Sequence, residues 1–207
     1  MTRIASATVA LAINRFCPPV FGFLLLVVIA LRSSELLGWY TVVTVFHFAL
    51  QTLPFLGLTP LIVKEAARRP EDAGRIFATS VGLALAVTAL LCLALPFVLL
   101  AADFPADVES AVWICALVTV PYVIAYSAEL ILVSHDEPRL LGSVPLVENS
   151  LRFGASLAAL ELGYGIAALF WFMLAGRVLA AVLFARALRN RVLRGLPMRC
   201  DPLLART

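Results

Sequence analysis

The sequence predicts an all-α integral membrane protein with six transmembrane helices, and three observations support this prediction. Hydrophobic residues make up 62% of the 207 residues and charged residues 14%, against about 45–50% and about 25% in typical soluble domains. The apolar residues gather in runs of ~20 or more, the length with which a helix crosses a bilayer. Basic residues concentrate in alternate connections between these runs, as the positive-inside rule describes. The net charge of only +3 gives no indication of nucleic-acid binding.

The stretch 35–75 sets the predicted orientation. It holds a turn at 36–38 and then an apolar run over 39–63. A loop follows that carries four basic residues, Lys64, Arg68, Arg69 and Arg75. An apolar run that ends in a cluster of positive charge is typical of a transmembrane helix delivered to the cytoplasmic face. We therefore place this loop inside the cell.

The remaining spans follow from the same reasoning. We expect one six-helix unit over residues 1–185 and a basic cytoplasmic tail over 186–207. Pro18 and Pro19 should break or bend the first helix, because proline removes a backbone donor and clashes with the preceding turn. The predicted spans are 7–31, 39–63, 76–101, 110–133, 140–160 and 166–184.

The distribution of charge supports a multi-pass protein of the cytoplasmic (inner) membrane with both termini in the cytoplasm. The connection 102–109 is acidic and contains neither lysine nor arginine, which suits the outer face. Twelve of the 16 basic residues then lie on the inner side and only Arg32 lies outside. The other three fall within predicted spans: Arg15, Arg152 and Arg177.

Charges inside a bilayer require a partner, a cavity or access to the headgroups. Arg15 should therefore face a partner or a cavity, or extend to the cytoplasmic headgroups, and these alternatives stay open. Glu148 and Arg152 are spaced i, i+4, so they can pair along one helical face. Arg177 lies near the middle of its span with no carboxylate at i±4, so its partner must come from another helix.

Two polar stripes lie on predicted spans. Thr44, His47 and Gln51 share one face, and Tyr122, Tyr126 and Glu129 share another. Such a stripe either packs against neighbouring helices or lines a water-filled path, and both interpretations stay open. His47 suits helix packing better than proton relay, and Glu129 is close enough to the inner end of its span to reach the interface.

Motifs of common enzymes are missing from the sequence. It has no Walker loop, no GxSxG, no HExxH and no glycine-rich dinucleotide fingerprint. The four cysteines are scattered without metal-ligand spacing. We therefore expect no metal and no cofactor, and no enzymatic activity. An intramembrane transferase remains an alternative because acidic and imidazole groups occur near the inner face, namely Glu129, His135, Asp136 and Glu137.

The order of features resembles the polysaccharide-flippase branch of the multidrug/oligosaccharidyl-lipid/polysaccharide (MOP) exporter superfamily. The first helix carries N-R-F (14–16), and the turn after it reads E-L-L-G-W-Y (35–40). The second helix ends in a stretch that begins G-L and ends E-A-A (57–67), and E-D-A-G-R (71–75) leads into the third. The fifth span contains E-N-S-L-R (148–152). The resemblance extends over nearly all 207 residues.

The resemblance implies one lobe of a MATE/MOP-like transporter that moves undecaprenyl-pyrophosphate-linked oligosaccharide across the cytoplasmic membrane. Members of the superfamily usually have two six-helix lobes, so the expected partners are the bilayer, the lipid-linked glycan and a second lobe. Arginine binds phosphate through forked hydrogen bonds, and polar side chains bind sugar hydroxyls. The expected cavity residues are Asn14, Arg15, His47, Gln51, Tyr122, Tyr126, Arg152 and Arg177, with Glu129 and Glu148 as sites of ion coupling or ion pairing.

Two other functions remain possible from the sequence. A multidrug or cation antiporter of the same superfamily would offer a carboxylate to its substrate, typically in the first helix, whereas no acidic residue precedes Glu35. A lone lobe also suits a non-transporting membrane partner of a polysaccharide-assembly complex. The intramembrane Arg177 argues against this second alternative.

Overall fold

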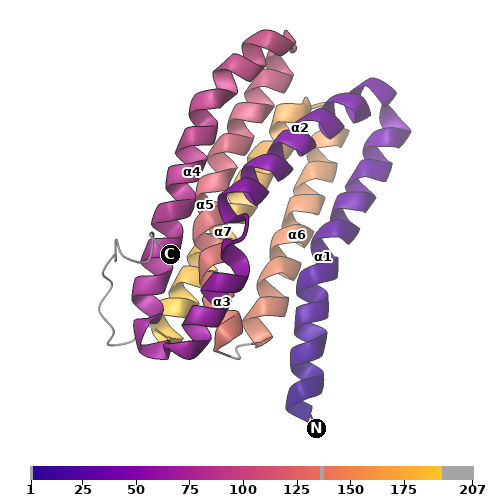
Figure 1. The fold of residues 1–207 in the computed structure, drawn as a ribbon. Helices are drawn as coiled ribbons and strands as arrows, with labels where there is room; N and C mark the ends of the chain where they lie inside the picture. The colour runs from indigo at the N-terminus through magenta and orange to yellow at the C-terminus, as the bar shows by residue number, and fades with distance from the viewer. Residues whose placement is uncertain (1, 136–137, 193–207) are drawn as a thin grey trace.

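The computed structural model describes residues 2–135 and 138–192, and every element within this part is a helix (Figure 1). The long helices run antiparallel, so successive connections alternate between the two ends of the bundle (Figure 1). In chain order the elements are α1 (Thr2–Arg32), α2 (Ser34–Thr52), the 3₁₀ helix η1 (Leu53–Phe55), α3 (Leu58–Arg68), the 3₁₀ helix η2 (Pro70–Asp72), α4 (Ala73–Ala102), α5 (Ala106–Ser134), α6 (Pro138–Glu161) and α7 (Ile166–Arg191).

Five helical stretches in the described part of the chain are long and apolar enough to cross a membrane, which indicates a multi-pass membrane protein. They are Leu11–Arg32, Ser34–Phe55, Pro70–Ala102, Ala106–Ser134 and Ile166–Arg191. The predicted fifth span, which corresponds to α6, is not among them, so the count of six stays a prediction. At 24 residues α6 is long enough to cross a bilayer, but its polar and charged residues lower its hydropathy.

The second predicted span, 39–63, is wrong as a single helix. The structure ends α2 at Thr52 and begins α3 at Leu58. Pro54 cannot donate a backbone hydrogen bond, and Gly57 has a φ of 78°, a left-handed conformation that glycine adopts without steric cost. The span is therefore a broken helix whose break lies around residues 53–57.

Two further local predictions differ from the structure. The predicted turn at 36–38 lies inside α2, because Ser33 caps this helix by accepting a hydrogen bond from the Leu36 N–H at 3.2 Å. Of the break or bend predicted at Pro18 and Pro19, the break does not occur, since α1 continues through both residues. Of the predicted basic tail over 186–207, α7 includes residues up to Arg191, and residues 193–207 lie outside the described part.

The helices pack as a bent row. α1 packs on α6, α6 on α7 and α7 on α5, while α2, α3 and α4 pack on α5 as well. α2 also reaches α1 and so joins the two ends of the row at the upper end in Figure 1. Below this junction α1 stands apart from α3 in the ribbon view (Figure 1). This arrangement leaves room for a cavity between α1, α5 and α6.

Polar residues divide the hydrophobic core into two clusters. On α5 the first cluster covers residues 108–118 and the second covers 123–132. On α7 the first covers residues 166–173 and the second 180–188. Tyr122 and Arg177 lie between the two clusters on their helices. The polar layer therefore lies near the middle of the bundle rather than at its ends.

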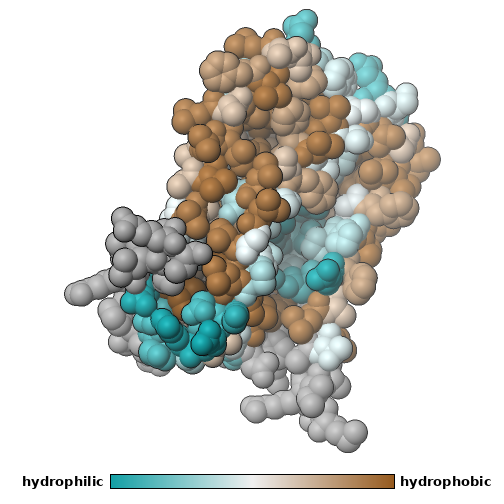
Figure 2. Space-filling view, in the orientation of Figure 1, coloured by the Kyte–Doolittle hydropathy of each residue, from teal (hydrophilic) through white to brown (hydrophobic). Residues whose placement is uncertain are grey.

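The outer surface is mainly apolar, as a lipid-facing surface should be. Large hydrophobic side chains such as Phe16, Leu31, Phe97 and Leu100 are more than half exposed. Figure 2 shows a hydrophobic surface over most of the face in view, with hydrophilic residues at the upper and lower ends and in a hollow between α1 and the α2–α3 segment. The hollow leads to the candidate site.

One end of the bundle is tied together by polar contacts. Asp107 Oδ2, in the first turn of α5, accepts a hydrogen bond from the Ile166 N–H at 3.0 Å and so caps α7. Arg32 donates to the Leu160 carbonyl at 2.7 Å and forms an ion pair with Glu161. These contacts fix the starts of α5 and α7 and the end of α6 at the side that we predict to face outward.

Candidate functional site

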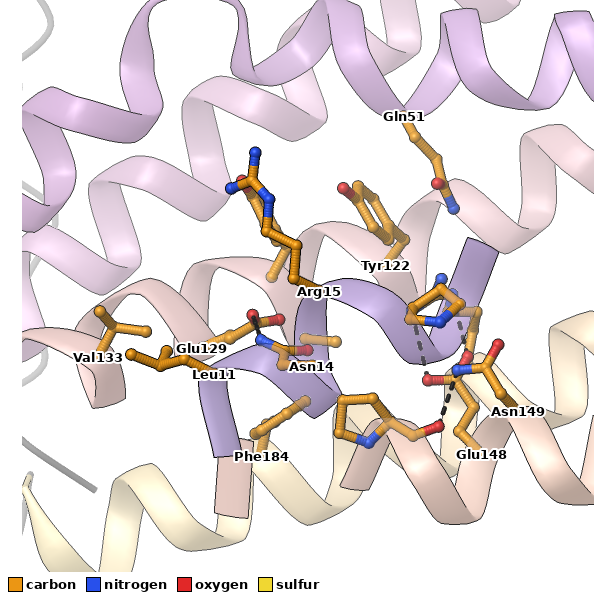
Figure 3. Close-up of a pocket in the computed structure, with 15 residues that line it drawn as sticks. Leu11, Asn14, Arg15, Gln51, Tyr122, Glu129, Val133, Glu148, Asn149 and Phe184 are labelled. Atoms are coloured by element: carbon orange, nitrogen blue, oxygen red, sulfur yellow. Dashed lines mark hydrogen bonds and ion pairs between the residues drawn. The ribbon is translucent and has the colours of Figure 1, made fainter. Parts of the chain in front are cut away.

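A cavity of about 520 Å³ opens in the polar layer and is lined by residues of five long helices (Figure 3). Its size is within the range of small-molecule binding sites, about 300–1,000 Å³. The lining residues are Leu11, Asn14, Arg15 and Pro18 of α1, Gln51 of α2, Tyr122, Ala125, Tyr126, Glu129 and Val133 of α5, Pro145, Glu148 and Asn149 of α6, and Arg177 and Phe184 of α7.

The α1 wall supplies one cation and one amide. Arg15 is exposed, and no carboxylate of the described residues lies within ion-pair distance of it. Asn14 Nδ2 donates a hydrogen bond to Glu129 Oε1 on α5 at 2.6 Å, across the cavity. Arg15 points away from Glu129 in Figure 3. The guanidinium of Arg15 is therefore free to meet a ligand, whereas the carboxylate of Glu129 already has one donor.

Glu148 and Arg177 form an ion pair between α6 and α7. Arg177 Nε lies 3.1 Å from Glu148 Oε1, and Arg177 Nη1 donates to Glu148 Oε2 at 3.3 Å. The guanidinium also lies over the Tyr122 ring, 5.2 Å from its centroid, in cation–π geometry. Glu148 is only 2% exposed, so its charge depends on this neighbour for compensation.

The close approach of α6 and α7 at this point depends on Gly176. A Cβ atom at this position would come within 3.2 Å of Glu148 Cγ. The glycine therefore leaves the space that the Glu148 side chain occupies on its way to Arg177.

An aromatic cluster forms the α5 side of the cavity. The rings of Tyr122 and Tyr126 stack with centroids 5.4 Å apart and an angle of 10° between their planes. Phe55, in the break after α2, meets Tyr126 edge to face with centroids 4.8 Å apart. Both tyrosines are half-buried, and no hydrogen bond of either hydroxyl is found within the described residues. Each phenol can therefore donate to or accept from a molecule in the cavity.

Two buried amides, Gln51 and Asn149, complete the wall. Gln51 is 8% exposed and Asn149 is 1% exposed. Asn149 Nδ2 donates to the Pro145 carbonyl at 2.7 Å, while its Oδ1 and the Nε2 of Gln51 have no partner in the described protein. Asn149 was not among the predicted cavity residues, although its place beside Glu148 on the same span was an available signal.

The structure brings most of the predicted site residues to this one cavity. Asn14, Arg15, Gln51, Tyr122, Tyr126, Glu129, Glu148 and Arg177 all line it, whereas His47 and Arg152 do not. His47 is buried one turn before Gln51 on α2. The requirement that Arg177 find its partner on another helix is met by Glu148 of α6.

Glu148 is in an ion pair, but its partner is Arg177 and not Arg152, the residue with which its i, i+4 spacing would permit a pair. Glu148 turns toward α7, where Gly176 leaves space, and its ion pair in the described structure is with Arg177. Arg152 lies one turn further along α6, half-buried and away from the cavity lining. The spacing of residues in the sequence could not decide between Arg152 and Arg177 as the partner of Glu148, because i, i+4 spacing permits an ion pair without requiring one.

The wall has equal numbers of positive and negative groups when all are ionised. Arg15 and Arg177 are opposed by Glu129 and Glu148. Since Glu148 compensates Arg177 and Asn14 donates to Glu129, Arg15 is the cation least compensated by its surroundings. The cavity thus combines one available cation with several neutral hydrogen-bonding groups, inside an otherwise apolar bundle.

No known protein family, no curated protein and no solved structure matches this chain. The interpretation of the cavity therefore depends on its chemistry and on the residue patterns described above.

Proposed function

We propose that this protein is one lobe of a membrane transporter that translocates a lipid-linked oligosaccharide. The cavity binds the pyrophosphate and the sugar of this ligand. The observation that carries this proposal is a 520 Å³ polar cavity, with Arg15 in its wall, between apolar clusters of a membrane bundle. Ligands of this kind have an anionic group, a polar head and an apolar tail. The cavity offers a guanidinium to the first and hydrogen-bonding groups to the second, and the surrounding bilayer accepts the third.

The position of Arg15 supports an anionic ligand. An arginine in the hydrocarbon region costs at least about 2.5 kcal/mol on insertion scales, so an uncompensated one is retained where it has a role. Guanidinium groups bind phosphate oxygens through two parallel charge-assisted hydrogen bonds. We assign Arg15 as the primary contact of the pyrophosphate, with Arg177 restrained by Glu148.

The broken second helix gives independent support. Discontinuous membrane helices are typical of transporter binding sites, because the interrupted backbone is tolerated where it lines a cavity. Here the break over 53–57 begins two residues after Gln51, and Phe55 packs against the cavity tyrosines. We further propose that α6 is the sixth span, that both termini are cytoplasmic, and that a second lobe closes the cavity.

Binding to the purified protein in lipid nanodiscs tests the proposal. We expect wild-type protein to bind undecaprenyl pyrophosphate and not undecaprenol. Arg15→Met should weaken binding by roughly 10- to 100-fold, as expected for loss of a charge-assisted hydrogen bond. Arg189→Met, an exposed arginine outside the cavity, should bind as wild type. Equal binding by the two arginine variants, or no discrimination between the two lipids, would refute the proposal.

A cation antiporter is the second candidate, and Glu129 is the observation that favours it. This carboxylate lines the cavity and is in no ion pair within the described residues. A cationic drug-like ligand would meet it directly. Binding of a quaternary ammonium compound that Glu129→Gln abolishes and Arg15→Met leaves intact would support this candidate over the anionic ligand.

A further inference from the structure

Two buried amides in the cavity wall have hydrogen-bonding atoms that the protein does not use. We propose that the part of the cavity lined by Gln51 and Asn149 is a binding subsite for a neutral sugar residue, recognised through one donor and one acceptor. This inference rests on the proposed function, because it assigns a place to the sugar of a lipid-linked ligand. It adds the residues that would distinguish a glycosylated lipid from a bare one.

The amide of Asn149 presents an acceptor. Its Nδ2 donates to the Pro145 carbonyl at 2.7 Å. Because a carbonyl can only accept, this contact assigns the nitrogen and the oxygen of the Asn149 amide. Oδ1 is left as an acceptor without a partner in the described protein, on a residue that is 1% exposed. Buried polar atoms are nearly always hydrogen-bonded. This oxygen is therefore an unused acceptor of a residue that lines the cavity.

The amide of Gln51 presents a donor from the opposite wall. Gln51 lies in the last turn of α2, just before the helix breaks, and is 8% exposed. Its Nε2 is buried without a partner, and no hydrogen bond of its side chain is found in the described structure. The side chain thus contributes nothing polar to the fold at this position, although its burial requires that its hydrogen-bonding capacity be met.

The other unpartnered buried side-chain atoms of neutral residues lie outside the cavity lining. They belong to His47, Ser127 and Ser156. Within the described wall, the donor of Gln51 and the acceptor of Asn149 are thus the unused buried neutral groups. Figure 3 shows both residues toward one end of the cavity, while Leu11, Glu129 and Val133 lie toward the other.

A sugar residue has the chemistry that these two atoms require. Each hydroxyl both donates and accepts, so adjacent hydroxyls can accept from Gln51 and donate to Asn149. A purely anionic group could accept from Gln51 but has no hydrogen to donate to Asn149 Oδ1. The charge at Arg15 and the neutral pair at Gln51 and Asn149 thus separate the cavity into a part for the pyrophosphate and a part for the sugar.

The test compares two ligands on the full chain in lipid nanodiscs: undecaprenyl pyrophosphate, and the same lipid carrying one glucose. We expect wild-type protein to bind the glucosylated lipid about tenfold more tightly, as one or two additional hydrogen bonds would provide. Gln51→Leu and Asn149→Leu should each bring the ratio of the two affinities close to one. The affinity for the bare lipid should be unchanged. Ser156→Ala removes an unpartnered buried hydroxyl of α6 outside the cavity and serves as the matched control.

The other outcomes overturn the inference in separable ways. If wild-type protein binds both lipids equally, the subsite is refuted while the proposed function stands. If it binds neither, both fail. If the leucine variants lose both ligands alike, or keep the preference, the amides serve the fold or bound water instead. Because Gln51 makes no hydrogen bond in the described protein, Gln51→Leu tests the subsite even if Asn149→Leu does not fold.

Discussion

Arg177 Nε on α7 lies 3.1 Å from Glu148 Oε1 on α6, and this ion pair joins two neighbouring helices in the middle of the bundle. Arg177 is also held against the ring of Tyr122 on α5. A charge that looks like a ligand contact in the sequence is thus engaged in the packing of three helices. The pair is expected to determine stability more than affinity.

Removing one member of this pair should be more harmful than removing both. Arg177→Met would leave the Glu148 carboxylate buried without its counter-ion, which typically costs about 3–5 kcal/mol. The double variant Glu148→Gln, Arg177→Met should be closer to wild type, because no uncompensated charge remains. Thermal or denaturant unfolding of the single and double variants in detergent micelles measures the coupling. Strictly additive effects would contradict a direct pairing.

Gly176 should be intolerant of side chains for the same reason. In Gly176→Ala the new Cβ would lie 3.2 Å from Glu148 Cγ, so α6 and α7 would have to move apart or Glu148 would have to shift. We expect destabilisation of about 1–3 kcal/mol, as for overpacking in a core. The matched control is Gly154→Ala on α6, where a Cβ meets nothing within 4 Å. That substitution should be neutral or slightly stabilising, since alanine favours the helix, and unfolding measurements compare the two.

The break between α2 and α3 should depend on Gly57. Its φ of 78° is a left-handed conformation, which costs a residue with a Cβ about 1–2 kcal/mol. Gly57→Ala should therefore destabilise the protein, and Gly57→Asn should do so less, because asparagine tolerates this conformation better. Gly38→Ala, in the regular helix of α2 with open space around it, is the control. Equal unfolding midpoints for the two alanine variants would show that the break does not require glycine.

Many of the residues that line the cavity could be predicted from the sequence. The spacing of polar residues along a single helix shows which of them share a face, and this requires no knowledge of the neighbouring helices. The i, i+4, i+7 spacing of Tyr122, Tyr126 and Glu129 predicts a shared face, and these three residues do line the cavity together. The same reasoning did not distinguish His47 from Gln51, which share a face of α2 but differ in depth along it. Only the packing of α2 against α5 decides that Gln51 reaches the cavity and His47 does not.

Contacts between helices were harder to predict, because they depend on how the helices are aligned along one another. Arg177 was expected to find its partner on another helix, but its 29-residue separation from Glu148 contains no local pattern that identifies that residue. The i, i+4 spacing pointed to Arg152 instead. Gly176 was a usable signal, since a small residue beside a charge on a membrane helix often marks a close helix–helix contact.

Whether α6 spans the membrane can be decided by labelling. A variant without native cysteines would carry one new cysteine at Ser134, at the end of α5, or at Leu162, just after α6. Leu162 is 74% exposed, and Ser134 is half-buried at the helix end. If α6 crosses the bilayer, a membrane-impermeant maleimide should label Leu162→Cys in intact spheroplasts and Ser134→Cys only in inverted vesicles. The reagent should also reach Asp103→Cys and Arg69→Cys from opposite sides, because α4 is one of the five apolar spans. These two variants are the controls for membrane integrity.

Labelling of Ser134→Cys and Leu162→Cys from the same side would mean that α6 does not cross, since its two ends would then share a compartment. The cavity would in that case belong to a five-span bundle, and the two-lobe transporter proposal would lose its architectural basis.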